Sequence, residues 1–214
     1  MARAIAARPE PRGLRLIDKG KAGAARRAPP VVSLSCILIP PPETLLPASD
    51  LDAPANTLAF RQLMGQFATG VAVVSLVGDT GGISAMTINS LVSVSLDPML
   101  VSWCLQNSSS QFAAYAGAES FAFSILAEDQ QALARRYAAR GDSALLPEDF
   151  EPGEGGLPVI RGALAHVACR QFAVHDAGDH TLILGAVTGM AWGASGRRPL
   201  VFQGGRFAGL EQRP

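Results

Sequence analysis

AGDHTLILGAV, residues 177–187, joins a Gly-Asp-His turn directly to an apolar run. Gly178 and Asp179 are residue types that favour tight turns, and the apolar residues after Thr181 predict a strand. His180 would then stand at the mouth of that strand, where a small molecule could meet its imidazole. A single His after a turn is also an ordinary loop residue, so this stretch predicts a turn and a strand but no activity by itself.

Short apolar runs bounded by turn residues continue in both directions from this stretch. Residues 91–95 alternate apolar and polar side chains, a period of two that suits a strand with one buried face. The further strands that we expect lie at 70–76, after the turn at 79–82, and at 99–105, 120–126, 163–174, 180–190 and 199–202. Many short strands with few helices between them predict a mainly β protein, an antiparallel barrel or sandwich. No βαβ pattern repeats, which argues against a doubly wound sheet.

A few helices are expected around these strands. Phe60, Leu63, Met64 and Phe67 follow one face of an amphipathic helix. A short helix at 110–116 could be capped by Ser108 or Ser109, and a longer one runs from 128 to about 139. The stretch 142–157 is rich in Gly, Pro and acidic residues and is expected to be a loop.

The composition limits the classes of function. The 214 residues are 48% hydrophobic and carry zero formal net charge, which suits one globular domain and argues against a nucleic-acid binder. No apolar run approaches the roughly 20 residues of a membrane span. Cys36, Cys104 and Cys169 lack metal-ligand spacing, and the last two lie in apolar runs, as reduced buried thiols do. A cytoplasmic location is the simplest reading.

The chain divides into two parts of different character. Ala, Arg and Pro dominate residues 1–30 without helical or strand periodicity, and such a segment cannot bury enough apolar surface to offset its ordering entropy. We expect residues 1–54 to be a disordered extension or the result of a mis-assigned start. Residues 55–214 form the folded domain.

Several common catalytic motifs are absent from the sequence. There is no Gly-x-Gly-x-x-Gly after a strand, no phosphate-binding Gly-x-x-x-x-Gly-Lys loop, and no His-Glu-x-x-His or Cys-x-x-Cys. No metal site is therefore expected. An enzyme with this profile would take its chemistry from a cofactor.

Four segments, in order, give the chain a family resemblance. They are the helix leading into Thr69-Gly70-Val71, MTINSLVSVSLDP at 86–98, CLQNSSS at 104–110, and Gly178-Asp179-His180-Thr181. With the closing PLVF at 199–202 and GRF at 205–207, the chain resembles the short-chain flavin reductase family. This resemblance implies an FMN-binding split β-barrel with Greek-key topology and a few short peripheral helices.

The resemblance also implies a cofactor site. Side chains with small hydroxyl and amide groups can satisfy flavin nitrogen and oxygen atoms without blocking the ring. The residues expected to bind cofactor are Met86, Thr87, Ile88, Asn89, Ser90, Ser93, Leu105, Gln106, Ser108, Ser109, Ser110, Gly178, Asp179 and His180. Gln106–Ser110 match the phosphate side of the site, and Ser108, Ser109 and Ser110 precede a predicted helix whose N-terminal N–H groups could bind an anion. The family often has a basic residue where Asn107 stands, and Arg135 or Arg136 could replace that cation.

His180 matches the residue that family members place beside the nicotinamide, where it would orient the hydride donor and count as the catalytic residue. The implied reaction is NAD(P)H:flavin oxidoreduction, with FMN or FAD as acceptor and NADH or NADPH as donor. The resemblance further implies a homodimer and a partner monooxygenase that receives reduced flavin, with no nucleic-acid or membrane partner. A flavin carrier without reductase activity, or a split-barrel flavoprotein oxidase, stays open as an alternative; a pyridoxine-phosphate oxidase relative would need an Arg/Lys cluster that the core strands lack.

Overall fold

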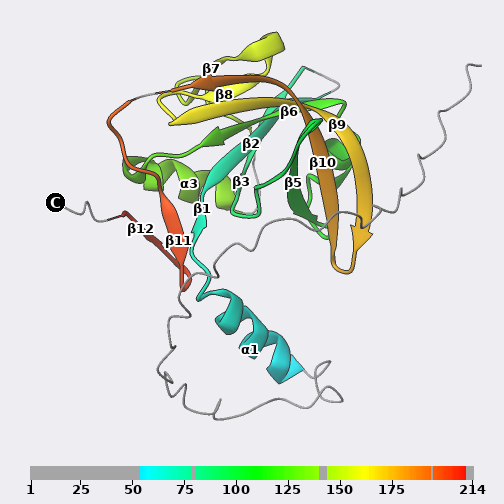
Figure 1. Ribbon diagram of the computed structural model, residues 1–214, viewed down its shortest axis with the longest axis vertical. Helices are drawn as coiled ribbons and strands as arrows, with labels where there is room; N and C mark the ends of the chain where they lie inside the picture. Colours follow the sequence, from blue (N-terminus) through cyan, green and yellow to red (C-terminus); the bar gives the residue numbers. More distant parts are fainter. Residues whose placement is uncertain (1–53, 79–80, 140–143, 194, 211–214) are drawn as a thin grey trace, which may run out of the picture. The chain divides into compact units, whose positions relative to one another are not determined.

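Two long paired strands, β9 (Ala165–Ala177) and β10 (His180–Trp192), form the centre of the molecule. Figure 1 shows the computed structural model, which describes residues 54–78, 81–139, 144–193 and 195–210. The predicted extension, which contains Cys36, lies outside these residues apart from Pro54.

β9 and β10 belong to a seven-stranded antiparallel sheet in the order β3-β2-β6-β9-β10-β5-β4. Its other members are β2 (Ala72–Val77), β3 (Ile83–Ile88), β4 (Val92–Leu96), β5 (Met99–Gln106) and β6 (Ser120–Ile125). The two edge strands, β3 and β4, follow one another in the chain and are joined by residues 89–91. This short link connects the two edges of the sheet, which curves into a barrel. The prediction of a mainly β protein with an antiparallel barrel is confirmed.

Smaller elements flank the barrel. β1 (Thr69–Gly70), β11 (Val201–Gln203) and β12 (Arg206–Ala208) form a three-stranded sheet, and β7 (Phe150–Pro152) pairs with β8 (Pro158–Ile160). The helices are α1 (Pro54–Met64), α2 (Phe112–Ala116) and α3 (Gln131–Ala138), with 3₁₀ turns at Glu128–Gln130 and Glu154–Gly156. None of the helices in the described ranges has the length and apolar character of a membrane span.

β2 shows why the core has two halves. Ala72, Val74 and Leu76 face an aromatic cluster inside the barrel, whereas Val71 and Val73 face a second cluster under α3. Since both faces are covered, β2 is buried from Ala72 to Leu76 and apolar at all of these positions except Ser75, whose hydroxyl donates to the carbonyl oxygen of Pro158 at 2.5 Å. The aromatic cluster consists of Trp103, Tyr115, Phe121 and Phe123, with Trp103 edge-on to the other three rings at 5.6–6.3 Å.

The long strands bend around this core at two register shifts in the β9–β10 pairing. Gly185 lies at the first shift, where a Cβ would come within 3.0 Å of Cys169 and 3.1 Å of Phe121. A side chain at this position would have to displace Cys169 or Phe121, so glycine allows the backbone of β10 to approach the core closely. Cys169 is fully buried beside it, and burial raises the pKa of its thiol to about 12, so it is an inert thiol as predicted.

Two predictions of burial are wrong. β4 was expected to bury one face, but most of its positions are exposed, with Leu96 at 85%, because β4 is an edge strand that no described element covers. The apolar side chains of α1 and the residues after it are likewise exposed: Leu58, Phe60, Leu63, Met64 and Phe67. Both surfaces have the apolar pattern that is usual for a buried face, but no described part of the chain covers either of them.

Smaller departures concern the element boundaries. The stretch predicted as a loop at 142–157 contains β7 and a 3₁₀ turn, because Pro158–Ile160 pairs with Phe150–Pro152. The short helix begins at Phe112 rather than Ser110. Its N-cap residue is Gln111, whose side chain makes no capping hydrogen bond to the backbone of the helix. Ser109 instead accepts a hydrogen bond on Oγ from the backbone N–H of Gln111 at 3.2 Å.

Candidate functional site

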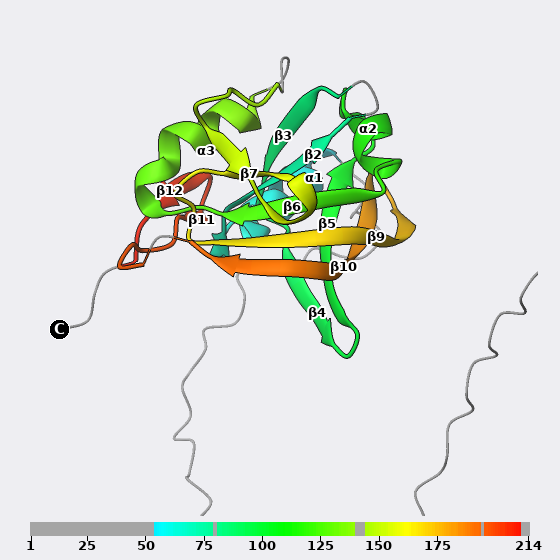
Figure 2. The same cartoon turned by 90° about the horizontal axis from the view of Figure 1, so that it is seen from above.

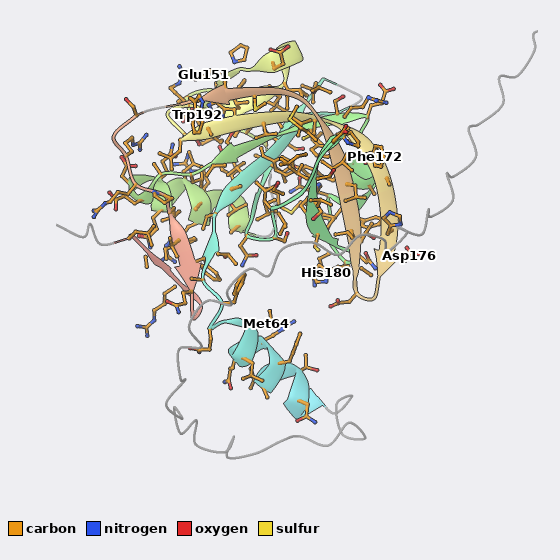
Figure 3. All side chains as sticks on the ribbon, in the orientation of Figure 1. Met64, Glu151, Phe172, Asp176, His180 and Trp192 are labelled. Carbon is orange, nitrogen blue, oxygen red and sulfur yellow. The ribbon has the colours of Figure 1, made fainter. Side chains whose placement is uncertain are left out.

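The β5–β10 pairing brings two predicted segments together. His180, the first residue of β10, lies directly opposite Gln106, the last residue of β5, and Thr181 lies opposite Leu105. Residues 178–181 therefore meet residues 105–107 at one end of the barrel, the end at which Figure 3 shows His180. The sheet register, rather than closeness in sequence, assembles this part of the site.

His180 is held by the residue before it. Its Nδ1 lies 2.7 Å from Oδ1 of Asp179, and because an ionised carboxylate only accepts, Nδ1–H is the donor. This hydrogen bond and the attraction to His180 lower the pKa of Asp179 below its usual value, with a smaller contribution from the charge of Arg61. The other ring nitrogen, Nε2, stays available on a side chain that is 40% exposed.

The link between β3 and β4 lies against the same strands. Ser90 accepts a hydrogen bond on Oγ from the backbone N–H of Cys104 at 3.0 Å. Three residues further on, Ser93 of β4 pairs with Val101 of β5. The Ser90–Ser93 part of the predicted segment therefore lies along β5 on the side away from β10, whereas Met86, Thr87 and Ile88 belong to β3 and pair with β2.

Several of the predicted hydroxyl and apolar side chains are used by the fold itself. Thr87 donates its hydroxyl proton to the carbonyl oxygen of Ala134 in α3 at 2.8 Å. Ile88 and Leu105 are buried in the aromatic cluster, and Met86 packs against it. These residues can offer a ligand their backbone groups or a remaining lone pair, but not a free donor side chain.

A second group of polar side chains is free. Within the described ranges no hydrogen bond or ion pair engages the side chains of Asn89, Ser93, Gln106, Ser108 and Ser110, and all of them are exposed. Gln106, Ser108 and Ser110 lie at and just after the end of β5, beside the β9–β10 turn. Asn89 lies in the β3–β4 link and Ser93 in β4, opposite Val101 of β5. We refer to these five exposed polar side chains together as the polar rim. This is a donor set of the kind that flavin heteroatoms and phosphate oxygens require.

An aromatic hollow lies on the other side of the β3 end. The cavity has a volume of about 180 Å³ and is lined by Val71, Thr87, Ile88, Asn89, Ala138, Phe202 and Phe207. Phe202 and Phe207 meet edge-on, with ring centroids 5.4 Å apart. Both aromatics belong to the PLVF and GRF segments that carry the family resemblance, but neither was among the residues predicted to bind the cofactor.

Neither arginine that could replace a phosphate cation is free. Arg135 lies over the ring of Phe207, 5.1 Å from its centroid, and Arg136 forms an ion pair with Asp149. The hypothesis that one of them serves the Ser108–Ser110 loop therefore has no contact in its favour.

The other hollows are remote from His180. One, of about 280 Å³, is lined by His166, Glu151, Glu154 and Trp192, and Figure 3 shows Glu151 and Trp192 at the opposite end of the barrel. His166 is half-buried there, with Nδ1 3.2 Å from Oγ of Ser124, and burial lowers its pKa. No cluster of three or more metal-ligating side chains occurs in the part of the chain that the structure describes.

Comparison with known proteins identifies the family. Residues 64–211 match the flavin reductase like domain. The chain is 45% identical over 152 residues to the FMN reductase (NADH) SmoA of Agrobacterium fabrum, covering 71% of this chain and 85% of that protein. It is 34% identical over 152 residues to HsaB of Rhodococcus jostii, the reductase subunit of a flavin-dependent monooxygenase, covering 71% of this chain and 77% of that one.

A solved structure agrees with this match. The NADH:FAD oxidoreductase SgcE6 of Streptomyces globisporus, in complex with NAD and FAD fragments, superposes with a TM-score of 0.67 at 35% sequence identity. The superposition covers 72% of this chain and 93% of that chain, so the β-barrel is shared almost throughout. The chain belongs to the flavin reductase-like domain family.

Proposed function

We propose that this protein is an NAD(P)H:flavin oxidoreductase that transfers a hydride from a reduced nicotinamide to FMN or FAD. The observation that carries the proposal is the family match over residues 64–211, which includes every residue of the candidate site. NADH is the proposed donor, because the names of both SmoA and SgcE6 specify NADH. The name of SmoA specifies FMN and that of SgcE6 specifies FAD, so we propose both flavins as substrates and test each.

The free polar rim would hold the flavin. Asn89 and Ser93 would bind ring and ribityl heteroatoms, and Gln106, Ser108 and Ser110 would bind the phosphate side. When bound, the flavin supplies a two-electron acceptor, and the protein contributes orientation. Exposed side chains without competing partners support this assignment, since each can turn its donor or acceptor towards a ligand at no loss to the fold.

His180 would orient the hydride donor. Asp179 accepts from Nδ1–H and so fixes the ring plane and leaves Nε2 to bind a polar group of the dinucleotide. Hydride transfer needs close approach and alignment, so a residue that positions the nicotinamide contributes mainly to binding of the donor.

We also propose a homodimer. Figure 2 shows the β4–β5 hairpin projecting from the barrel. Large apolar side chains are exposed on this hairpin and on α1, and a cluster of exposed apolar side chains often marks a protein–protein interface. A second copy would cover them and close the open rim. Light scattering should give a mass of twice 22.3 kDa. Leu96→Glu should lower the measured mass, whereas Trp192→Glu, at the opposite end of the barrel, should not change it. A wild-type protein with the mass of a monomer would contradict the proposed homodimer.

A partner monooxygenase that takes up diffusing reduced flavin is proposed from the name of HsaB, a monooxygenase reductase subunit. We propose a cytoplasmic location, because Cys104 and Cys169 are free thiols and the donor is a cytoplasmic metabolite.

The experiment is an NADH oxidation assay with purified protein and either FMN or FAD. We expect flavin-dependent loss of nicotinamide absorbance, and none with either flavin or nicotinamide would overturn the proposed reaction. Binding without oxidation would favour the carrier alternative, and flavin retained through gel filtration would favour a flavoprotein oxidase. His180→Ala should raise the KM for NADH more than the Kd for flavin, whereas His175→Ala, an exposed His on the same hairpin, should change neither.

A further inference from the structure

Asn107 makes three hydrogen bonds to the turn that carries His180. Its backbone N–H donates to the carbonyl oxygen of Asp179 at 3.0 Å, and its Nδ2 donates to that of Gly178 at 3.1 Å. Its Oδ1 accepts from Oγ1 of Thr181 at 2.8 Å. Asn107 thus contacts the three residues that surround His180, although it lies 71 positions from Gly178 in the sequence.

The turn depends on such support. β9 ends at Ala177 and β10 begins at His180, so only Gly178 and Asp179 connect the strands, and Gly178 has a positive φ of 70°. A two-residue turn at the end of long strands, exposed to solvent, has few contacts of its own. Asn107 joins it to the end of β5, the strand on the far side of β10 from β9.

The chemistry of the contact suits asparagine. One amide group supplies a donor for Gly178 and an acceptor for Thr181 at the same time. Thr181 is 3% exposed, and Asn107 is the partner that its hydroxyl has among the described residues, so the bond satisfies a buried donor. An amide carries no charge, and this side chain adds no cation for a phosphate.

We propose that Asn107 is a positioning residue, which holds the Gly178–Thr181 turn so that the imidazole of His180 meets the hydride donor in one orientation. This role rests on the proposed function, because it assigns His180 to the nicotinamide. It distinguishes Asn107 from its neighbours Gln106 and Ser108, whose side chains are free for the flavin itself. Asn107 acts through the turn and touches neither substrate.

The test compares Asn107→Ala, Thr181→Val and the double variant with wild type. Each single change should raise the KM for NADH roughly tenfold with a much smaller effect on kcat, because the donor is bound in a less fixed orientation. The flavin Kd, followed by fluorescence quenching, should change less than about twofold. The double variant should be no worse than Asn107→Ala, since both changes break the same bond. His175→Ala is the matched control on the same hairpin.

A second readout does not require activity. Hydrogen exchange in a peptide covering residues 176–182 should be faster in both single variants and unchanged in His175→Ala. Asn107→Asp retains the acceptor for Thr181 but sets an oxygen against the Gly178 carbonyl, so its KM for NADH and exchange rate should lie between those of wild type and Asn107→Ala. Unchanged exchange, or faster exchange with an unchanged KM for NADH, overturns the positioning role. An inactive wild type instead overturns the proposed function on which the role rests.

Discussion

Ser90 attaches the link between the two edge strands to Cys104 of β5: its Oγ accepts the backbone N–H of Cys104 at 3.0 Å. The bond lies within the segment that the family resemblance assigns to the flavin. A side chain at this position therefore serves the closure of the fold before it serves any ligand.

Ser90→Ala should lower the free energy of unfolding by about 1 kcal/mol, because a half-buried backbone N–H loses its partner. Urea denaturation measures this directly. Ser93→Ala, in the same segment but without a hydrogen bond from its side chain, should stay within about 0.5 kcal/mol of wild type. Equal stability of all three proteins would mean that the Ser90 bond does not hold the barrel closed.

Trp103 gives a prediction for the core. It is fully buried, and within the described residues its indole Nε1–H has no hydrogen-bond partner. Trp103→Phe removes that unpaired donor, whose burial costs about 1–3 kcal/mol, and this gain offsets part of the cavity that the smaller ring leaves. The variant should lose clearly less stability than Trp103→Ala, for which about 3–5 kcal/mol is expected. Equal losses in the two variants would show that the indole N–H is satisfied in solution.

His166 predicts a dependence of stability on pH. Burial holds its pKa in the folded protein below the ordinary value of 6.5, although the charge of Glu151 acts in the opposite direction. As the pH falls below about 6.5 the unfolded chain binds a proton that the folded protein still rejects, so the free energy of unfolding decreases until the folded pKa is reached. His166→Gln should show a smaller decrease between pH 7.5 and 5.5 in urea titrations, whereas His175→Gln should follow wild type. Identical slopes for wild type and His166→Gln would contradict the role of burial.

The sequence predicted the strands well where periodicity and burial agree. The turn at Gly178-Asp179 and the start of β10 at His180 lie where the residue types indicated, and the buried β2 follows from its apolar run. β4 lies where the alternation predicted a strand, but the burial of one of its faces was mispredicted, because alternation indicates that a face is suited to burial and not that a neighbour covers it. β7 and β8 were missed because three-residue strands are too short to show a period.

The candidate site was predictable in its segments but not in the use of its side chains. Thr87 bonds to Ala134, 47 residues away, and Asn107 bonds to Gly178 and Thr181 across the sheet. Which hydroxyl or amide is free for a ligand depends on these long-range contacts, and no local pattern reports them. The motif placed His180 at a strand mouth, but the register opposite Gln106 requires the barrel topology.

The most direct test of the account is a titration of the purified wild-type protein with FMN and with FAD, followed by quenching of flavin fluorescence. We predict saturable quenching with at least one flavin, weakened in Asn89→Ala and Ser93→Ala and retained in His180→Ala. A folded protein that quenches neither flavin would contradict the claim that the polar rim beside His180 is a flavin site.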